Sequence, residues 1–246
     1  AASGLFKTQN AITFNLRAGS AFNAPLNVTS GSTVAATDLS SPYLGKLFGD
    51  VTIDAGGTLG SYMTFFNSNF SLDVYGNVTN NGTIIASTSA NKVFSFYGST
   101  FVNNGLVSHP YFSFKSVSTL SGTGSFTSNT SVINGAAVTL SSNHQFANMN
   151  INAGGSLDIS NRLVGFTASN PIAQNGTFNT TNSDIIYNGT ALQTVSVTNI
   201  NYVGLKINNP AGATLPANIT IPDTLSVILG DLNLNGKIII TLKLLI

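Results

Sequence analysis

The sequence predicts an all-β protein, built as a β-solenoid of roughly ten irregular coils of about 18–23 residues each. Two features of the 246-residue chain favour strands over helices: it has no Glu and only 7% charged residues, and it is rich in Val, Ile, Thr, Phe and Tyr. A third feature, short alternating segments that recur between Gly and Asn turns, favours coils. Each segment is too small to bury its own apolar face, so the segments must stack, with strands about 4.8 Å apart.

A first repeat begins with two apolar residues that are separated by one residue of any type. A polar turn with glycine follows, and a third apolar residue stands six positions after the second. We expect its apolar members to point into a shared core, and the glycines of "DAGGT" (54–58) and "NAGGS" (152–156) to turn the chain at a corner. A phosphate-binding loop would need a helix after its glycines, and strand-like alternation follows instead. The repeat occurs at Phe14, Leu16 and Phe22; at Leu26, Val28 and Val34; at Val51, Ile53 and Leu59; at Met149, Ile151 and Leu157; and, two residues longer, at Leu205, Ile207 and Leu215.

A second repeat lies between these. "LDVYGNVTNNGTIIA" (72–86) resembles "FSFYGSTFVNNGLVS" (94–108), with one extra residue inside the latter, and "FSFKSVSTLSGTGSF" (112–126) restarts the theme. Shorter, partial copies of this repeat follow at 172–178 and 185–191. We expect Asn and Gly at the corners, where they tolerate left-handed backbone, and stacked Asn side chains that form an amide ladder.

The repeats predict a single β-solenoid domain over residues 1–246, with a less regular N-terminal part or cap at 1–50 and an apolar terminal strand at 237–246. One or two β-sandwiches would also give short strands with turns every 8–12 residues or so. The solenoid is preferred because glycine turns recur with matching flanks, and because the Tyr-Gly and Asn-Asn-Gly segments repeat in order.

Three segments carry a resemblance to a known class of proteins: "LSVILGDLNLNGKIIITL" (225–242), "NVTNNGTI" (77–84) and "DIIYNGTALQTV" (184–195). They resemble the repeats of secreted bacterial right-handed parallel β-helix proteins, such as autotransporter passengers and filamentous-haemagglutinin-like adhesins. The resemblance covers most of the chain from about residue 50 onward. It implies an exported surface or extracellular protein that is structural or adhesive, and it carries over no catalytic residue.

Composition argues against several classes of partner and cofactor. A formal charge of +1 gives no field that would attract nucleic acid or an anionic membrane. The chain has no Cys and therefore no disulfide or thiolate metal site, and no apolar run is long enough for a membrane-spanning helix. We expect no cofactor and no metal, and a mature N-terminus left by removal of a signal peptide.

Enzymes do occur on β-helices, so the acidic residues and histidines are the candidates for catalysis. Glycoside hydrolysis requires two carboxyl groups that face one sugar ring, and no Asp-Asp or Asp-x-Asp motif is present. We interpret the aspartates as turn and corner residues. His109 and His144 are expected in loops, without the neighbours of a catalytic or metal-binding motif. The aspartates are Asp38, Asp50, Asp54, Asp73, Asp158, Asp184, Asp223 and Asp231.

The chain ends in "GKIIITLKLLI", an apolar strand with no polar cap beyond it. We expect this strand to pair with the next subunit, head to tail, in a contact that propagates into a fibre. Two alternatives stay open: the chain is a fragment of a longer passenger, or the strand completes the final coil. The predicted interface residues are Ile238, Ile239, Ile240, Leu242, Leu244, Leu245 and Ile246.

The sequence therefore predicts a non-catalytic extracellular or cell-surface protein, the subunit of a self-assembling fibre or the stalk of an adhesin. Its expected partner is itself or a cell-surface polysaccharide. One alternative is a carbohydrate-binding or carbohydrate-active β-helix protein, for which the aromatic segments "SYMTFF" (61–66) and "YFSF" (111–114) would supply an exposed stripe. A second alternative is an ice-binding solenoid, although Thr-x-Thr does not recur at a constant phase.

Overall fold

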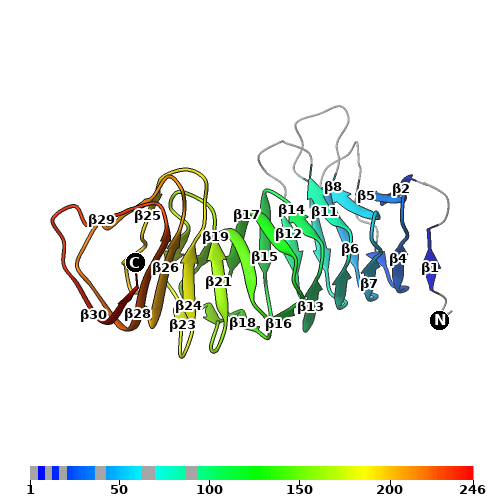
Figure 1. The fold of residues 1–246 in the computed structure, drawn as a ribbon. Coiled ribbons are helices and arrows are strands. Elements are labelled where there is room, and N and C mark those ends of the chain that lie inside the picture. Colours follow the sequence, from blue (N-terminus) through cyan, green and yellow to red (C-terminus); the bar gives the residue numbers. More distant parts are fainter. Residues whose placement is uncertain are drawn as a thin grey trace. The chain divides into compact units, whose positions relative to one another are not determined.

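The structure is a computed structural model that describes residues 5–8, 13–16, 21–36, 43–61, 70–86, 93–133 and 135–245. The chain divides into two compact units, Ala1–Asn129 and Thr130–Ile246. Each unit consists of short strands that are joined by turns and stacked with parallel neighbours (Figure 1). No helix is present among the described residues, and hence none that is long and apolar enough to cross a membrane.

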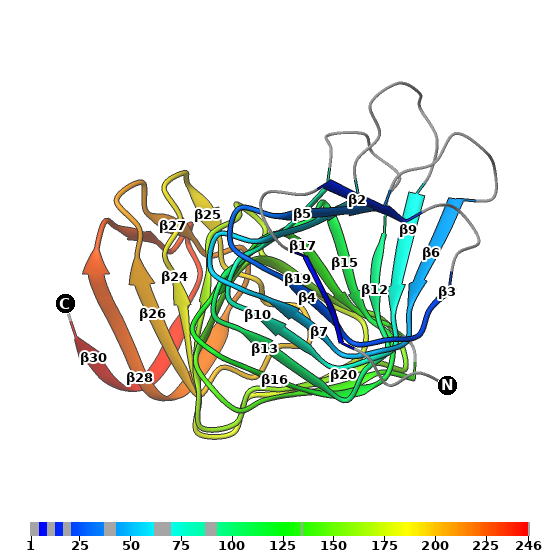
Figure 2. The same cartoon turned by 90° about the vertical axis from the view of Figure 1, so that its right-hand side faces the viewer.

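The first unit winds three strands per coil, so its strands form three faces (Figure 2). The first face contains β1 (Phe6–Lys7), β4 (Leu26–Val28), β7 (Val51–Ile53), β10 (Val78–Asn80), β13 (Thr100–Asn103) and β16 (Val117–Ser121). The second contains β2 (Thr13–Leu16), β5 (Thr33–Ala36), β8 (Thr58–Ser61), β11 (Thr83–Ala86), β14 (Leu106–Ser108) and β17 (Ser125–Val132). The third contains β3 (Ala21–Phe22), β6 (Tyr43–Leu47), β9 (Phe70–Val74), β12 (Phe94–Phe96) and β15 (Tyr111–Phe114).

The second unit repeats the principle, and a few of its strands are longer, up to the 11 residues of β28. Its strands pair in parallel in three groups. One is β18 (Ala137–Leu140), β20 (Ser156–Asp158) and β23 (Thr177–Asn179). The next is β19 (His144–Ile151), β21 (Leu163–Phe166), β24 (Asp184–Tyr187), β26 (Gly204–Asn208), β28 (Ile219–Leu229) and β30 (Ile239–Leu245), with β22 (Ile172–Gln174) on the second half of β19. The last is β25 (Gln193–Thr194), β27 (Ala213–Thr214) and β29 (Leu232–Asn233).

Strand register confirms the repeat predicted between 72–86 and 94–108. Leu72 lies opposite Phe94, 22 positions later, whereas Val78 lies opposite Phe101, 23 positions later. The offset therefore grows by one residue inside the Tyr-Gly turn, as the sequence comparison requires. The Asn77 side chain accommodates the longer turn, because its Oδ1 accepts a hydrogen bond of 2.9 Å from the backbone N–H of Thr100.

The core consists of columns of apolar side chains, one column inside each face of the first unit. Alternation places every second residue of a strand inside, so partners on successive strands stack directly above one another. None of the following is more than 2% exposed: Leu26, Val51, Val78, Phe101 and Leu120 on the first face; Val34, Leu59, Ile84, Val107 and Phe126 on the second; Leu47, Val74, Phe96 and Phe114 on the third.

Glycine turns the corners, as predicted. Gly56 and Gly154, in the two "AGG" segments, have φ angles of 79° and 76°, a region in which an L side chain is strained. The next glycine in each segment closes a tight turn: the N–H of Gly57 donates to the Asp54 carbonyl at 2.8 Å. A Cβ at residue 57 would lie 2.5 Å from the Val28 carbonyl oxygen of the preceding coil. Close approach of stacked corners therefore requires glycine there.

The chain is thus an all-β parallel β-solenoid of about ten coils. Successive residues of the first inner column, from Phe6 to Leu120, are 20, 25, 27, 23 and 19 positions apart. Two of these coils exceed the predicted 18–23 residues. Part of their extra length lies in the corner between the first and second faces, which has four residues in these two coils (29–32 and 54–57) and two residues in the 23-residue coil (81–82).

Candidate functional site

The last two coils of the second unit expose an unusual amount of apolar surface. Among the predicted interface residues, Ile238 is 61% exposed, Ile240 63%, Leu242 86% and Leu244 52%. Leu245 is also exposed and Ile239 is half-buried, while Ile246 lies outside the described residues. On β28 and the turn after β29, Ile228, Leu229 and Leu234 are exposed as well. We call this surface, residues 228–245, the apolar end.

The geometry of β30 follows from its pairing with β28. β30 has two arms, Ile239–Thr241 opposite Ile219–Ile221 and Lys243–Leu245 opposite Thr224–Ser226, with a register shift between them. Ile221 and Leu225 of β28 are buried, so their partners Thr241 and Leu244 face the interior of the coil. Leu244 is nevertheless half exposed, because no further described strand lies on the other side of β30.

An apolar cavity of about 590 Å³ opens inside this end. Leu225, Val227, Leu232, Leu234, Ile238, Ile239 and Leu244 supply its apolar wall, and Asp231, Lys237 and Thr241 contribute polar groups. The cavity is the continuation of the solenoid core beyond its last stacked side chains. Its lining therefore fits apolar side chains rather than a charged ligand.

The first coil of the first unit also exposes core-facing residues. β1 pairs with β4 alone among the described strands, and Phe6 lies opposite the buried Leu26. Phe6 therefore faces the core column, yet it is 36% exposed, and the adjacent Leu5 is 59% exposed. The Phe6 ring contacts Phe22 edge-on, with centroids 5.5 Å apart.

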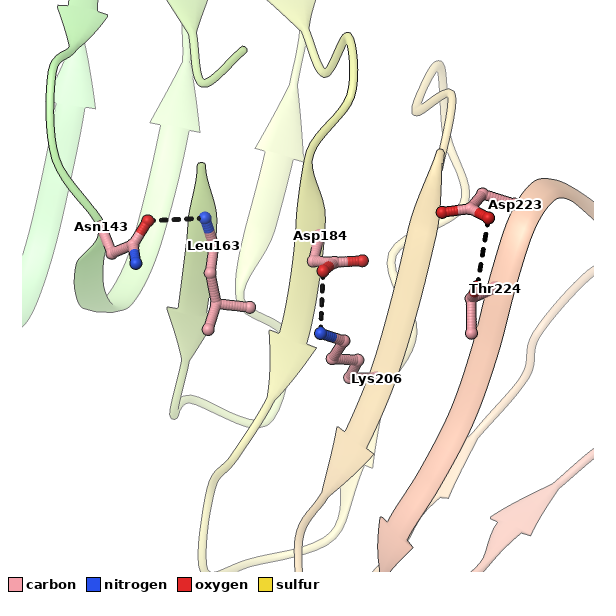
Figure 3. A network of polar contacts seen from close by, with 6 residues as sticks. All are labelled: Asn143, Leu163, Asp184, Lys206, Asp223 and Thr224. Atoms are coloured by element: carbon pink, nitrogen blue, oxygen red, sulfur yellow. Dashed lines mark hydrogen bonds and ion pairs between the residues drawn. The ribbon is translucent and has the colours of Figure 1, made fainter. Parts of the chain in front are cut away.

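A polar surface covers the outer side of β24, β26 and β28 (Figure 3). Lys206 Nζ lies 2.8 Å from Asp184 Oδ2, and both side chains are about one-third exposed. Next to this pair, Gly204 leaves room for the Asp184 side chain, which would clash with a Cβ at that position. Thr224 donates a hydrogen bond of 3.2 Å to Asp223, and Asn143 accepts one of 2.9 Å from the Leu163 N–H. The pairs are local, so this surface is a solvated face without converging groups.

Asp73 is the most buried aspartate of the described chain, at 8% exposure. Burial raises the pKa of its carboxyl group, although hydrogen bonds from Ser95 and Tyr75 and the charges of Lys46 and Lys115 act in the opposite direction. These groups line the outer side of the third face, since Lys46, Asp73 and Ser95 lie opposite one another on β6, β9 and β12. One carboxyl group among two lysines lacks the second carboxyl that glycoside hydrolysis requires.

A column of aromatic rings stands beside Asp73, one position after each strand of this face. Phe48, Tyr75 and Tyr97 stack with centroids 4.7 Å apart and interplanar angles of 10° and 11°. Phe48 is 44% exposed and the two tyrosines are half-buried. We call these three residues the aromatic column. The sequence predicted an aromatic stripe at 61–66 and 111–114 instead. Residues 62–66 lie outside the described residues, and Phe112 and Phe114 are in the core.

The remaining aspartates and both histidines are dispersed. Asp38 lies outside the described residues, and the others form no group of three acidic or histidine side chains in the ranges that the structure covers. His109 is in a loop, as predicted, and is 1% exposed. The loop prediction for His144 is wrong: it is the first residue of β19 and points inward, where its ring stacks on Phe146 at 6.0 Å. A polar ring side chain is accommodated there because Ser142 offers hydrogen-bond partners to Nδ1.

A buried polar cluster in the second unit has no counterpart in the sequence analysis. The Tyr187 and Tyr202 hydroxyls are 2.6 Å apart in the core, and burial raises the pKa of both. Tyr202 donates to the Ser196 carbonyl at 2.6 Å, and Tyr187 accepts from the Ser196 N–H at 2.8 Å. Both hydroxyls are thus satisfied by the backbone, which indicates a structural role. Their spacing of 15 residues, off the coil period, gave no signal in the sequence.

Comparison of the chain with protein-family models, with curated proteins and with solved structures gives no match. Strand pairing alone therefore defines the fold, a parallel β-solenoid of about ten coils.

Proposed function

We propose that this protein is a non-catalytic extracellular structural protein that associates head to tail, as the subunit of a surface fibre or the stalk of an adhesin. The observation that carries the proposal is the apolar end, where a terminal strand and an open apolar cavity face solvent. A second copy that adds its first coil there would pair the free edge of β30 and cover the cavity.

Energetics favour such a contact. Burying one Leu or Ile side chain fully contributes about 1.5–3 kcal/mol, and the apolar end offers several. The formal charge of +1 gives little repulsion between copies. A heterologous contact of this kind leaves a new free end on each added copy, so it propagates into a fibre. The resemblance of 77–84, 184–195 and 225–242 to repeats of autotransporter passengers and haemagglutinin-like adhesins supports an extracellular setting.

The proposal is tested by sedimentation velocity and electron microscopy of the purified chain over a range of concentrations. We expect concentration-dependent oligomers or fibres. Leu242→Asp should abolish them while leaving the circular-dichroism spectrum unchanged, because Leu242 is 86% exposed and its replacement costs the fold little.

Val117→Asp is the matched control, since Val117 is a 71% exposed apolar residue in the first unit. It should assemble like the unaltered chain, and a chain truncated before Lys237 should remain monomeric. A chain that stays monomeric at every concentration contradicts the proposal. So does a Leu242→Asp variant that assembles normally.

A second candidate function is the binding of a neutral polysaccharide along the aromatic column. The observation that favours it is the stack of Phe48, Tyr75 and Tyr97, in which Phe48 is 44% exposed. Ligand sites combine aromatic side chains with a few polar groups, which the two tyrosine hydroxyls would supply here.

Isothermal titration against a panel of neutral polysaccharides tests this candidate. Tyr97→Ser should weaken binding. Tyr111→Ser should not, because Tyr111, the first residue of β15, is a 40% exposed tyrosine outside the aromatic column. The candidate is wrong if the unaltered chain binds no polysaccharide of the panel. It is also wrong if Tyr97→Ser binds as tightly as Tyr111→Ser.

A further inference from the structure

We propose that the apolar end receives β1 of a second copy, with Phe6 inserted over the cavity, Phe6 opposite Ile239 and Lys7 opposite Ile240. This inference rests on the proposed head-to-tail association and specifies its junction. It names the segment that occupies the cavity and the register in which it pairs.

The position of Phe6 supports its role as the inserted side chain. Phe6 belongs to an inner column, since its partner Leu26 is 2% exposed, yet 36% of Phe6 itself is accessible. Within one copy, the outer side of β1 has no described strand beside it. A core-facing and partly exposed aromatic ring is complementary to an apolar cavity in a second copy.

The cavity supports the same occupant. Its volume of about 590 Å³ exceeds what one phenyl ring requires, and its wall is largely Leu, Val and Ile. Phe6 already contacts Phe22 edge-on, so the two rings present a joined apolar surface. Apart from Asp231, Lys237 and Thr241, the side chains that line the cavity are apolar, which suits an inserted phenyl ring.

The inward residues of the two strands match in number and in polarity, which fixes the register. In β30, Ile239 and Thr241 line the cavity, while Ile240 points outward and is 63% exposed. Around β1, Phe6 faces inward, Lys7 is exposed, and Thr8 is 2% exposed. Placing Phe6 opposite Ile239 therefore sets apolar against apolar and Thr8 against Thr241.

In this register β1 of the second copy would pair with β30 in parallel, like the strand pairs within one copy. The strand pairs described in both units are parallel, and the order of arms in β30 matches the order of β1 and β2 in the chain. β1 then adds to the first arm, and β2 follows to the second arm at Lys243–Leu245. Strand addition supplies backbone hydrogen bonds, and the Phe6 pocket supplies specificity.

Engineered disulfides test the junction cleanly, because the chain contains no Cys. Two single variants of the full chain, Lys7→Cys and Ile240→Cys, are mixed in equal amounts and oxidised under assembling conditions. Residues directly opposite on adjacent strands lie within disulfide range. We expect a disulfide-linked dimer in the mixture and none with either variant alone. The control mixture, Lys7→Cys with Val117→Cys, should give no linked dimer.

A Phe6→Asp variant should lose assembly, whereas Phe6→Leu should retain it. The outcomes separate the two proposals. If the unaltered chain does not assemble, the proposed function itself fails. If the chain assembles but Ile240→Cys links only to itself, the copies meet tail to tail and the junction proposed here is wrong. If Phe6→Asp assembles as well as the unaltered chain, Phe6 does not occupy the cavity.

Discussion

At the residue scale, the corner glycines connect the sequence most directly with the fold. The two "AGG" segments use one residue for its left-handed backbone and the next for its lack of a side chain, because the coils meet at the corner at van der Waals distance. The glycines therefore mark the coil period. The same left-handed geometry is adopted by asparagine at Asn161, Asn182 and Asn199.

Substitution of these glycines separates the two requirements. Gly57→Ala should lower the free energy of unfolding by about 1–3 kcal/mol, because the added Cβ meets the Val28 carbonyl oxygen at 2.5 Å. Gly31→Ala is the control: its φ of 73° is strained, but nothing lies within 4 Å of the added Cβ, so its cost should be about 1–2 kcal/mol at most. Urea denaturation measures both. A larger loss for Gly31→Ala than for Gly57→Ala would contradict the close stacking of corners.

Two aspartates should give opposite dependences of stability on pH. Burial raises the pKa of Asp73 above 3.8, so its favourable contribution is complete below 3.8 and is lost as the pH rises through the folded-state value. Burial also acts to raise the pKa of Asp158, but hydrogen bonds from the Ser160 hydroxyl and N–H outweigh it and lower that pKa below 3.8. The contribution of Asp158 is present above 3.8 and is lost as the pH falls through the folded-state value.

Denaturant unfolding of Asp73→Asn and Asp158→Asn at several pH values checks these signs. The stability of the unaltered chain relative to Asp73→Asn should rise from about pH 7 to about pH 4. Relative to Asp158→Asn, it should be greatest near neutral pH and should fall below about pH 4. Parallel curves for the two variants would show that the carboxyl groups do not occupy the environments described.

At the element scale, stacked asparagines hold the first unit's coils in register, as the sequence predicted. Asn80 Nδ2 donates to Asn103 Oδ1 at 2.8 Å, and both residues are 0% exposed. One position later, Asn104 Nδ2 donates to Asn81 Oδ1 at 2.9 Å, but on the exposed side. The two adjacent residues of each Asn-Asn-Gly triplet thus form an inner and an outer ladder of the same chemistry.

The inner ladder should matter more than the outer one. Asn103→Ala removes the 2.8 Å hydrogen bond and leaves the buried Asn80 Nδ2 only a 3.3 Å bond to the Leu106 carbonyl, so it should cost about 1–3 kcal/mol of unfolding free energy. Asn104→Ala removes a hydrogen bond of similar length at the surface, where water replaces it, and should cost under about 0.5 kcal/mol. Thermal and urea unfolding measure the difference. Equal losses would mean that burial of the ladder contributes nothing.

The sequence predicted those elements whose signal recurs once per coil. The inner columns, the one-residue offset at the Tyr-Gly turns and the corner glycines all repeat, so that comparison of one coil with the next reveals them. Features formed by a single coil were missed. The Tyr187–Tyr202 pair and the inward His144 depend on local hydrogen-bond partners that only the folded chain brings together. The aromatic column also recurs once per coil, at Phe48, Tyr75 and Tyr97, but the sequence does not show that these three rings stack on one another.

At the scale of the whole molecule, a coil with described neighbours on both sides is buried further than a coil with a described neighbour on one side only. The apolar end and β1 both show this: Leu244 and Phe6 face inward, and both are partly exposed. The apolar residues of β30 were identifiable from the sequence, whereas Ile228, Leu229 and Leu234 were not predicted. The cavity was not identifiable, because its lining comes from β28, β29, β30 and the turns between them, which only the folded chain brings together.

Fibre diffraction from the assembled protein tests the central claim, a parallel β-solenoid that extends by adding copies coil upon coil. The account predicts fibres one solenoid wide, with a reflection near 4.8 Å along the fibre axis, because strands of successive coils stack along that axis both within a copy and across each junction. A chain that remains monomeric at all concentrations, or fibres whose 4.8 Å reflection lies across the axis, would contradict it.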